Sequence, residues 1–83
     1  MPNSSRSLHG VDAKAIAKAI KEFRENVRPE VSQRDLAGGL KWPHSVIGMM
    51  ESGQRHVRVI ELIAIAKALG LQPEELFRRC LRG

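Results

Sequence analysis

The stretch from Ser32 to Gly53, SQRDLAGGLKWPHSVIGMMESG, predicts two very short helices joined by a tight turn. Ser32 begins the first helix, because its hydroxyl can cap the amide of Asp35 while the Asp35 carboxylate reaches back toward Ser32. Gly38 and Gly39 then weaken the helix, each by up to about 1 kcal/mol relative to alanine. The first helix of the pair is therefore expected to be short.

The chain then turns at Lys41-Trp42 and starts a new helix at once. Pro43 suits the first position of that helix, where its missing amide hydrogen costs nothing. The helix is expected to run to about Glu51 or Ser52, with Gly53 ending it in the left-handed conformation. Trp42 in this turn is expected to pack, although its indole N–H could still donate a hydrogen bond.

Helical spacing of apolar residues predicts three further helices. From Asp12 to about Asn26 the apolar residues recur at three- and four-residue intervals, and Asp12 is a candidate N-cap. Residues 59–69, VIELIAIAKAL, are apolar nearly all round and are expected to form the most buried element, which Gly70 stops. Residues 71–81, LQPEELFRRCL, form the last helix. No segment sustains a two-residue alternation, so the predicted fold is all-α, a compact bundle of five helices.

Length and composition are those of one small globular domain. The chain has 83 residues, of which 42% are hydrophobic and 28% charged. Its first ten residues, MPNSSRSLHG, are polar and lack the apolar stretch of a signal peptide, so we expect a flexible leader at 1–10 and a folded domain at 11–83. Cys80 stands alone and cannot make an internal disulfide. A reducing cytoplasm is the expected compartment, and neither a metal nor another cofactor is expected.

The charge balance favours a polyanionic partner. Fourteen Lys and Arg residues against nine Asp and Glu give a net charge of +5, which suits nucleic acid. This evidence is weak alone, because many basic proteins bind no nucleic acid.

The second helix of the pair has two unlike faces. On a wheel of 100° per residue, Val46, Ile47 and Met50 form an apolar arc. The other arc carries no charge between Lys41 and Glu51, and it holds His44, Ser45, Gly48, Met49 and Ser52. Two interpretations stay open from the residues themselves. The face is either a solvated surface that is poor in charge, or a surface that enters the DNA major groove, which admits an α-helix.

The order of residues resembles a known family. Ser32-Gln33, Leu36-Ala37, Leu40, Ile47, Glu51, Gly53 and Arg55 stand at the spacing of the phage-repressor-like (Cro/C1, or XRE) helix-turn-helix family. The following IAIAKALGLQPEELF resembles that family's fourth and fifth helices, and the match covers roughly Ala15 to Leu81. The resemblance implies a five-helix lambda-repressor-like domain with its helix-turn-helix in helices two and three. It also implies a sequence-specific regulator of transcription, most simply a repressor, that binds a palindromic operator in double-stranded DNA as a homodimer.

The resemblance also implies roles for individual residues. Gln33 would bind a phosphate, and Ser52 and Arg55 would hold the DNA backbone. Base edges would face four residues at the start and on the outer arc of the second helix of the pair: Pro43, His44, Ser45 and Met49. For each of these, a solvated or packing role is the alternative.

Other positions depart from the family pattern or add to it. Lys41 replaces the usual glycine of the turn and must adopt a left-handed geometry or reshape the turn. Met49 stands where Arg, Lys or Gln is common, so it can make only apolar contact. A longer loop before Ser32 places the usual arginine of the first helix at Arg24, which we expect to pair with Glu51. Lys41 and Arg58 are further candidates for phosphate contact.

A second class of function is a protein-interaction role, such as an antitoxin-like protein or an adaptor that binds a partner, for example a toxin, through its C-terminal helices. It predicts an exposed apolar patch around Leu76, Phe77 and Leu81. An enzyme is not predicted, because the sequence lacks a nucleophile–base pair, a metal cluster and a phosphate-binding glycine loop.

Overall fold

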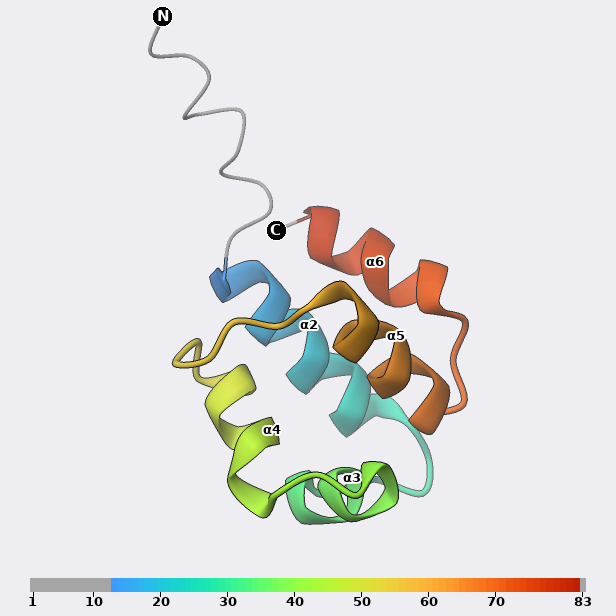
Figure 1. Cartoon of the computed structure of the whole chain (residues 1–83). Helices are drawn as coiled ribbons and strands as arrows, with labels where there is room; N and C mark the ends of the chain where they lie inside the picture. Colours follow the sequence, from blue (N-terminus) through green and yellow to red (C-terminus); the bar gives the residue numbers. More distant parts are fainter. Residues whose placement is uncertain (1–12, 83) are drawn as a thin grey trace, which may run out of the picture.

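The computed structural model describes residues 13–82, and within that range the chain forms five helices and no strand (Figure 1). The all-α, five-helix fold is therefore confirmed. The candidate N-cap Asp12 and the leader at 1–10 lie outside the described residues. The helices are α2 (Ala13–Asn26), α3 (Gln33–Leu40), α4 (His44–Glu51), α5 (Val59–Ala68) and α6 (Pro73–Arg82).

Helix α2 packs against α4 on one side and against α6 on another, while α5 joins α3 to α6 (Figure 1). Apolar side chains from all five helices meet in one core. Its largest fully buried members are Ile20, Ile47, Met50, Ile65 and Leu76. Each short helix therefore draws its stability from packing against its neighbours, since helices of this length are marginal alone.

Three helices end in the same way, with a left-handed residue whose neighbours satisfy the last carbonyl groups. Gly53 has a φ of 80° and Gly70 a φ of 76°, as expected for the ends of α4 and α5. At the end of α3 the residue is Lys41, with a φ of 61°. The amide of Lys41 donates to Gly38 O at 3.1 Å, and that of Trp42 donates to Ala37 O at 2.9 Å. Lys41 thus takes the left-handed geometry and keeps the tight turn.

Helix α4 begins one residue later than predicted. Pro43 is its N-cap, with an extended ψ of 146°, and not its first helical residue. The Pro43 carbonyl accepts from the amide of Val46 at 3.1 Å, so the proline still closes the first turn. At the start of α3, Ser32 Oγ accepts from the amide of Asp35 at 3.0 Å, the predicted cap.

Helix α5 is buried on one side only. It buries Leu62, Ile65 and Ala66, but the first-turn residues Val59 and Ile60 are 66% and 71% exposed. The inner face of α5 meets α3 and α6, and no described element covers its first turn. Although α5 is apolar on nearly all sides, its first turn is exposed and only its inner face is buried.

Candidate nucleic-acid interface

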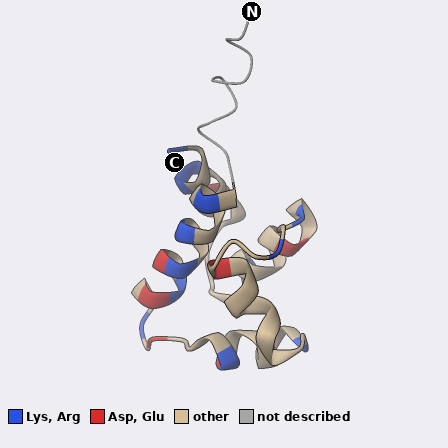
Figure 2. Ribbon diagram, turned by 90° about the vertical axis from the view of Figure 1, so that its left-hand side faces the viewer, with Lys and Arg blue, Asp and Glu red and all other residues tan. Residues whose placement is uncertain are grey.

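The outward face of α4 carries mostly short side chains and no charge. Pro43, His44, Ser45 and Ser52 are exposed, and Gly48 and Met49 are half-buried. The ribbon of α4 carries no Lys or Arg (Figure 2), and its single acidic residue, Glu51, is its last. On the opposite side, Ile47 and Met50 are buried in the core. The four residues predicted to face base edges thus lie on or beside one uncovered helix face.

The two residues before Pro43 divide between surface and core. Lys41 is exposed, whereas Trp42 is half-buried and packs against the core. The left-handed backbone of Lys41 places this cation in the turn between α3 and α4. Lys41 is thus a charged side chain beside the N-terminal end of α4.

A buried ion pair anchors the other end of α4. Arg24 Nε donates to Glu51 Oε2 at 2.6 Å, and Arg24 Nη2 donates to Glu51 Oε1 at 3.0 Å. The side chains of Arg24 and Glu51 are 8% and 4% exposed. Arg24 Nη1 also donates to the carbonyl of Val31 at 2.9 Å. The expected pair of Arg24 and Glu51 therefore links α2, the segment before α3 and the end of α4.

The electrostatics of this pair follow from its position. The hydrogen bonds that Arg24 donates to Glu51 raise the pKa of Arg24 above its ordinary value, against the opposing effect of burial. A carboxylate in the last turn of a helix is unfavourable beside the helix dipole. The Arg24 guanidinium offsets that effect and links the end of α4 to α2.

Gln33 joins the same network, which the sequence did not reveal. Its Nε2 donates to Glu51 Oε1 at 2.8 Å, although Gln33 is exposed and lies 18 residues away in sequence. Gln33 is the first residue of α3, where backbone amides have no partner within the helix. The exposed side chain of Gln33, at a helix N-terminus with free backbone N–H groups, is thus held in place by the buried carboxylate of Glu51.

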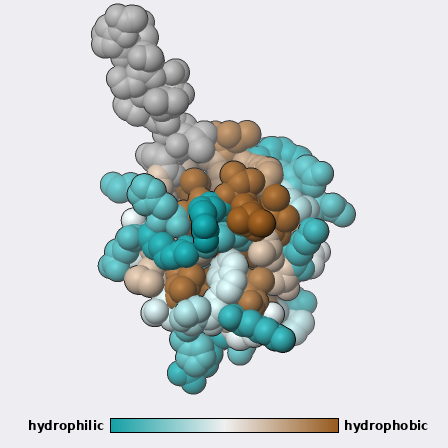
Figure 3. All heavy atoms as spheres, viewed as in Figure 1, coloured by the Kyte–Doolittle hydropathy of each residue, from teal (hydrophilic) through white to brown (hydrophobic). Residues whose placement is uncertain are grey.

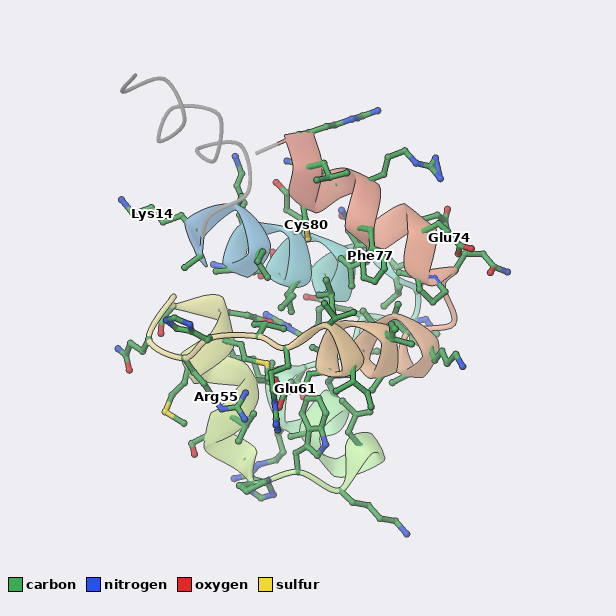
Figure 4. The ribbon with its side chains drawn as sticks, turned by 45° about the horizontal axis from the view of Figure 1, so that its top comes forward. Lys14, Arg55, Glu61, Glu74, Phe77 and Cys80 are labelled. Atoms are coloured by element: carbon green, nitrogen blue, oxygen red, sulfur yellow. The ribbon has the colours of Figure 1, made fainter. Side chains whose placement is uncertain are left out.

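A second ion-pair cluster forms beyond α4, around Glu61. Arg55 donates through Nη1 to Glu61 Oε1 at 3.1 Å and through Nη2 to Glu61 Oε2 at 3.0 Å (Figure 4). Glu61 also accepts from the backbone amide of Arg58 at 2.9 Å, which caps the start of α5. The hydrogen bonds from Arg55 are the main reason that the pKa of Glu61 is lowered to about 2.

This cluster distinguishes two cations that the sequence could not rank. Arg55 is two-thirds buried and neutralised by Glu61, whereas the Arg58 side chain is 75% exposed and approaches Glu61 only at 3.4 Å. Arg58 is therefore the more accessible charge in the loop after α4. An acidic residue at the third position of a helix is a capping signal, so the capping role of Glu61 could have been predicted from the sequence.

Ser52 uses its hydroxyl within the protein. Its Oγ donates to the carbonyl of Met49 at 3.1 Å, which also accepts from the backbone amides of Gln54 and Arg55. Ser52 Oγ retains lone pairs that can accept, but it would have to exchange this bond to donate to a phosphate.

Residues 13–82 contain no cluster of three or more His, Cys, Asp or Glu side chains suited to a metal ion. Over the same range, none of the helices has the length and apolar character required to span a membrane.

Comparison with known proteins agrees with this geometry. Residues 20–76 match the family HTH_3, helix-turn-helix. No curated protein shows significant similarity to the sequence.

Two solved structures are similar. An XRE-family like protein from Pseudomonas syringae pv. tomato str. DC3000 superposes with a TM-score of 0.77 at 24% identity, covering 94% of this chain and 93% of that one. The restriction-modification controller protein C.AhdI from Aeromonas hydrophila superposes with a TM-score of 0.70 at 32% identity, covering 83% of this chain and 97% of that one. The chain therefore belongs to the phage-repressor-like (XRE) helix-turn-helix family of DNA-binding proteins.

Proposed function

We propose that this chain is a sequence-specific regulator of transcription, acting as a repressor, that places α4 in the major groove of a palindromic operator. The observation that carries the proposal is the uncharged, uncovered face of α4 with cations at its margins. The major groove admits a helix and offers hydrogen-bond donors, acceptors and thymine methyl groups to its side chains. The similarity to C.AhdI, a restriction-modification controller protein, supports a regulatory role.

The roles follow from chemistry and exposure. The exposed His44 ring and Ser45 hydroxyl can exchange hydrogen bonds with base edges. Met49 and Pro43 can make only apolar contacts, for example with a thymine methyl group. These four residues would read sequence, since contacts to base edges are what distinguish one site from another.

The backbone contacts would come from residues around α4. Gln33 at the N-terminus of α3, Lys41 in the turn and Arg58 would meet phosphates, which their exposure supports. Arg55 and Ser52 already have partners in Glu61 and the Met49 carbonyl. Their contribution to phosphate binding would therefore be smaller than that of Lys41 or Arg58.

Two copies of the chain would bind the two halves of a palindrome. An apolar groove of about 290 Å³ lies between α2, α5 and α6, with Val59, Phe77 and Leu81 in its lining. Figure 3 shows hydrophobic side chains gathered where α5 begins, beside α6. Val59, Ile60 and Leu81 are the large apolar side chains exposed between residues 13 and 82. Burial of this surface against a second copy would supply a hydrophobic driving force for dimerisation.

The same surface is the basis of the second candidate, a role as antitoxin-like protein or adaptor. The apolar patch predicted for it is corrected in one respect, because Leu76 is fully buried in the core. Leu81 is 63% exposed and Phe77 is half-buried. Sedimentation of the pure protein separates the two candidates: a concentration-dependent dimer favours the regulator, and a monomer at all concentrations favours a separate protein partner.

Selection of bound duplexes from a random pool, followed by salt titration, tests DNA reading. The slope of log affinity against log salt should be about −0.9 for each neutralised phosphate. His44→Ala should lose discrimination at one base pair of each half-site, whereas Arg58→Ala should weaken all sequences alike. Binding that is indifferent to salt, or no enriched sequence after several rounds, would refute the proposal.

A further inference from the structure

Gly48 lies in the interior of α4, where glycine is among the least favourable residues. Its φ is not in the left-handed region, since the positive-φ glycines described are Gly53 and Gly70. The backbone conformation therefore does not require glycine at position 48. The reason for a glycine at this position is therefore sought in the side chains around it.

A side chain from another helix lies against Gly48. A Cβ atom built at position 48 would stand 3.2 Å from Oε1 of Gln33 and 3.9 Å from its Cδ. The first distance is shorter than ordinary van der Waals contact, so the Gln33 amide would have to move. Gly38 and Gly39 in α3 have nothing within 4 Å of the same position. Among these helical glycines, Gly48 alone has a neighbour in tight contact with the position of a Cβ atom.

The Gln33 side chain crosses Gly48 on its way to Glu51. Its Nε2 donates to Glu51 Oε1 at 2.8 Å, and Glu51 is held by two hydrogen bonds from Arg24. Positions 48 and 51 are three residues apart and so lie on the same side of a helix. The oxygen of the amide therefore lies over Gly48 and its nitrogen over Glu51. The second hydrogen on that nitrogen stays available to another acceptor.

We propose that Gly48 is a positioning residue, whose bare backbone lets the Gln33 amide lie across α4 and hold one orientation for contact with a DNA phosphate. A side chain that is already ordered loses less conformational entropy on binding. The inference rests on the phosphate contact of Gln33 in the proposed function. It assigns Gly48 a role inside the protein, in place of close approach of the α4 backbone to DNA.

The contact between Gly48 and Gln33 can be tested without DNA, by thermal unfolding of Gly48→Ala, Gln33→Ala and the double variant. Gly38→Ala is the matched control, because it makes the same change in a helix with no neighbour nearby. We expect Gly38→Ala to raise the unfolding midpoint. Gly48→Ala should raise it by a similar amount when it is combined with Gln33→Ala, and by clearly less when Gln33 is retained. Equal gains in both backgrounds would overturn the contact.

A second readout is the side-chain amide of Gln33 in ¹H–¹⁵N spectra. Its two resonances should shift in Gly48→Ala, because the added methyl group displaces the amide relative to Glu51, and should stay in place in Gly38→Ala. Unchanged Gln33 resonances in Gly48→Ala would overturn the proposed positioning.

The consequence for binding is measured on random and selected duplexes. Loss of the prior order of one side chain predicts about a fivefold weaker affinity per protomer for Gly48→Ala on both kinds of duplex. In the Gln33→Ala background the same substitution should have no further effect. An equal loss in both backgrounds would overturn the proposal in favour of close backbone approach. If the unaltered protein binds no duplex, the proposed function fails, while the unfolding and spectral experiments still decide the contact.

Discussion

The substitution Glu51→Gln tests whether the buried ion pair holds the helix-turn-helix together. Both oxygens of Glu51 accept from Arg24, and Oε1 also accepts from Gln33. Glutamine has nearly the same shape but replaces one oxygen by an NH₂ group. That group would face N–H donors at 2.6–3.0 Å, and Arg24 would remain charged with its side chain only 8% exposed.

The size of the effect follows from burial. Breaking a buried pair by removing one partner costs about 3–5 kcal/mol, because the remaining charge is uncompensated. The introduced amide can still accept through its oxygen, so we expect a loss near the lower limit, about 3 kcal/mol. For a domain of this size each kcal/mol lowers the unfolding temperature by roughly 4–8 °C, which predicts a decrease of about 12–24 °C. Calorimetry or circular dichroism at neutral pH measures this directly.

The matched control is Glu22→Gln in α2. Glu22 Oε1 forms an ion pair with Arg79 Nη2 of α6 at 2.8 Å, a distance comparable to those of the Arg24–Glu51 pair, but the side chains of Glu22 and Arg79 are 34% and 26% exposed. Solvent screening limits such a pair to about 1 kcal/mol or less. If Glu51→Gln lowers the unfolding temperature no more than Glu22→Gln, burial of the Arg24–Glu51 pair does not determine stability and the reasoning is wrong.

Three further predictions concern other parts of the domain. Lys41→Gly should stabilise the protein by about 1 kcal/mol, because glycine adopts the left-handed conformation without strain; an unchanged or lower stability in a denaturant titration would contradict this. The same substitution should weaken binding to all duplexes alike, as measured by fluorescence anisotropy. The low folded-state pKa of Glu61, about 2 against an ordinary 4.5, means that the unfolded chain binds this proton more tightly than the folded protein does. The stability that the ionised Glu61 carboxylate contributes, about 1–2 kcal/mol after screening, is therefore present above about pH 4.5 and is lost as the pH falls toward 2. Glu61→Gln should flatten this part of the curve of stability against pH. An equally steep curve in the variant would exclude Glu61 as the source of the slope. Leu76→Ala should lower the free energy of unfolding by about 2–5 kcal/mol, because Leu76 is fully buried. Leu81→Ala should change it by no more than about 0.5 kcal/mol in the monomer, because Leu81 is exposed. Similar losses for the two variants in chemical denaturation would contradict this difference in burial.

The local signals in the sequence were sufficient for the helices and their ends. Ser32 caps α3, and Gly53 and Gly70 end α4 and α5, because capping depends on residues within one turn of the helix end. Pro43 was placed within one residue of its position. The order of residues along the helix-turn-helix also sufficed for the family. The pairing of Arg24 with Glu51 was expected from the family resemblance, and periodicity or spacing in the chain did not indicate it.

The contacts that define the candidate interface were decided by the tertiary structure. Gln33 meets Glu51 across 18 residues, and Arg24 meets Glu51 across 27. No local pattern encodes such contacts, because they depend on how α2, α3 and α4 cross. For the same reason, composition could not tell that Val59 and Ile60 are exposed while Leu76 is buried. The sequence by itself determined the short helices, their caps and the uncharged face of α4. Only packing determined which side chains surround that face, and it placed the Gln33 amide over Gly48, because a side chain's neighbours are set by the crossing of helices far apart in the chain.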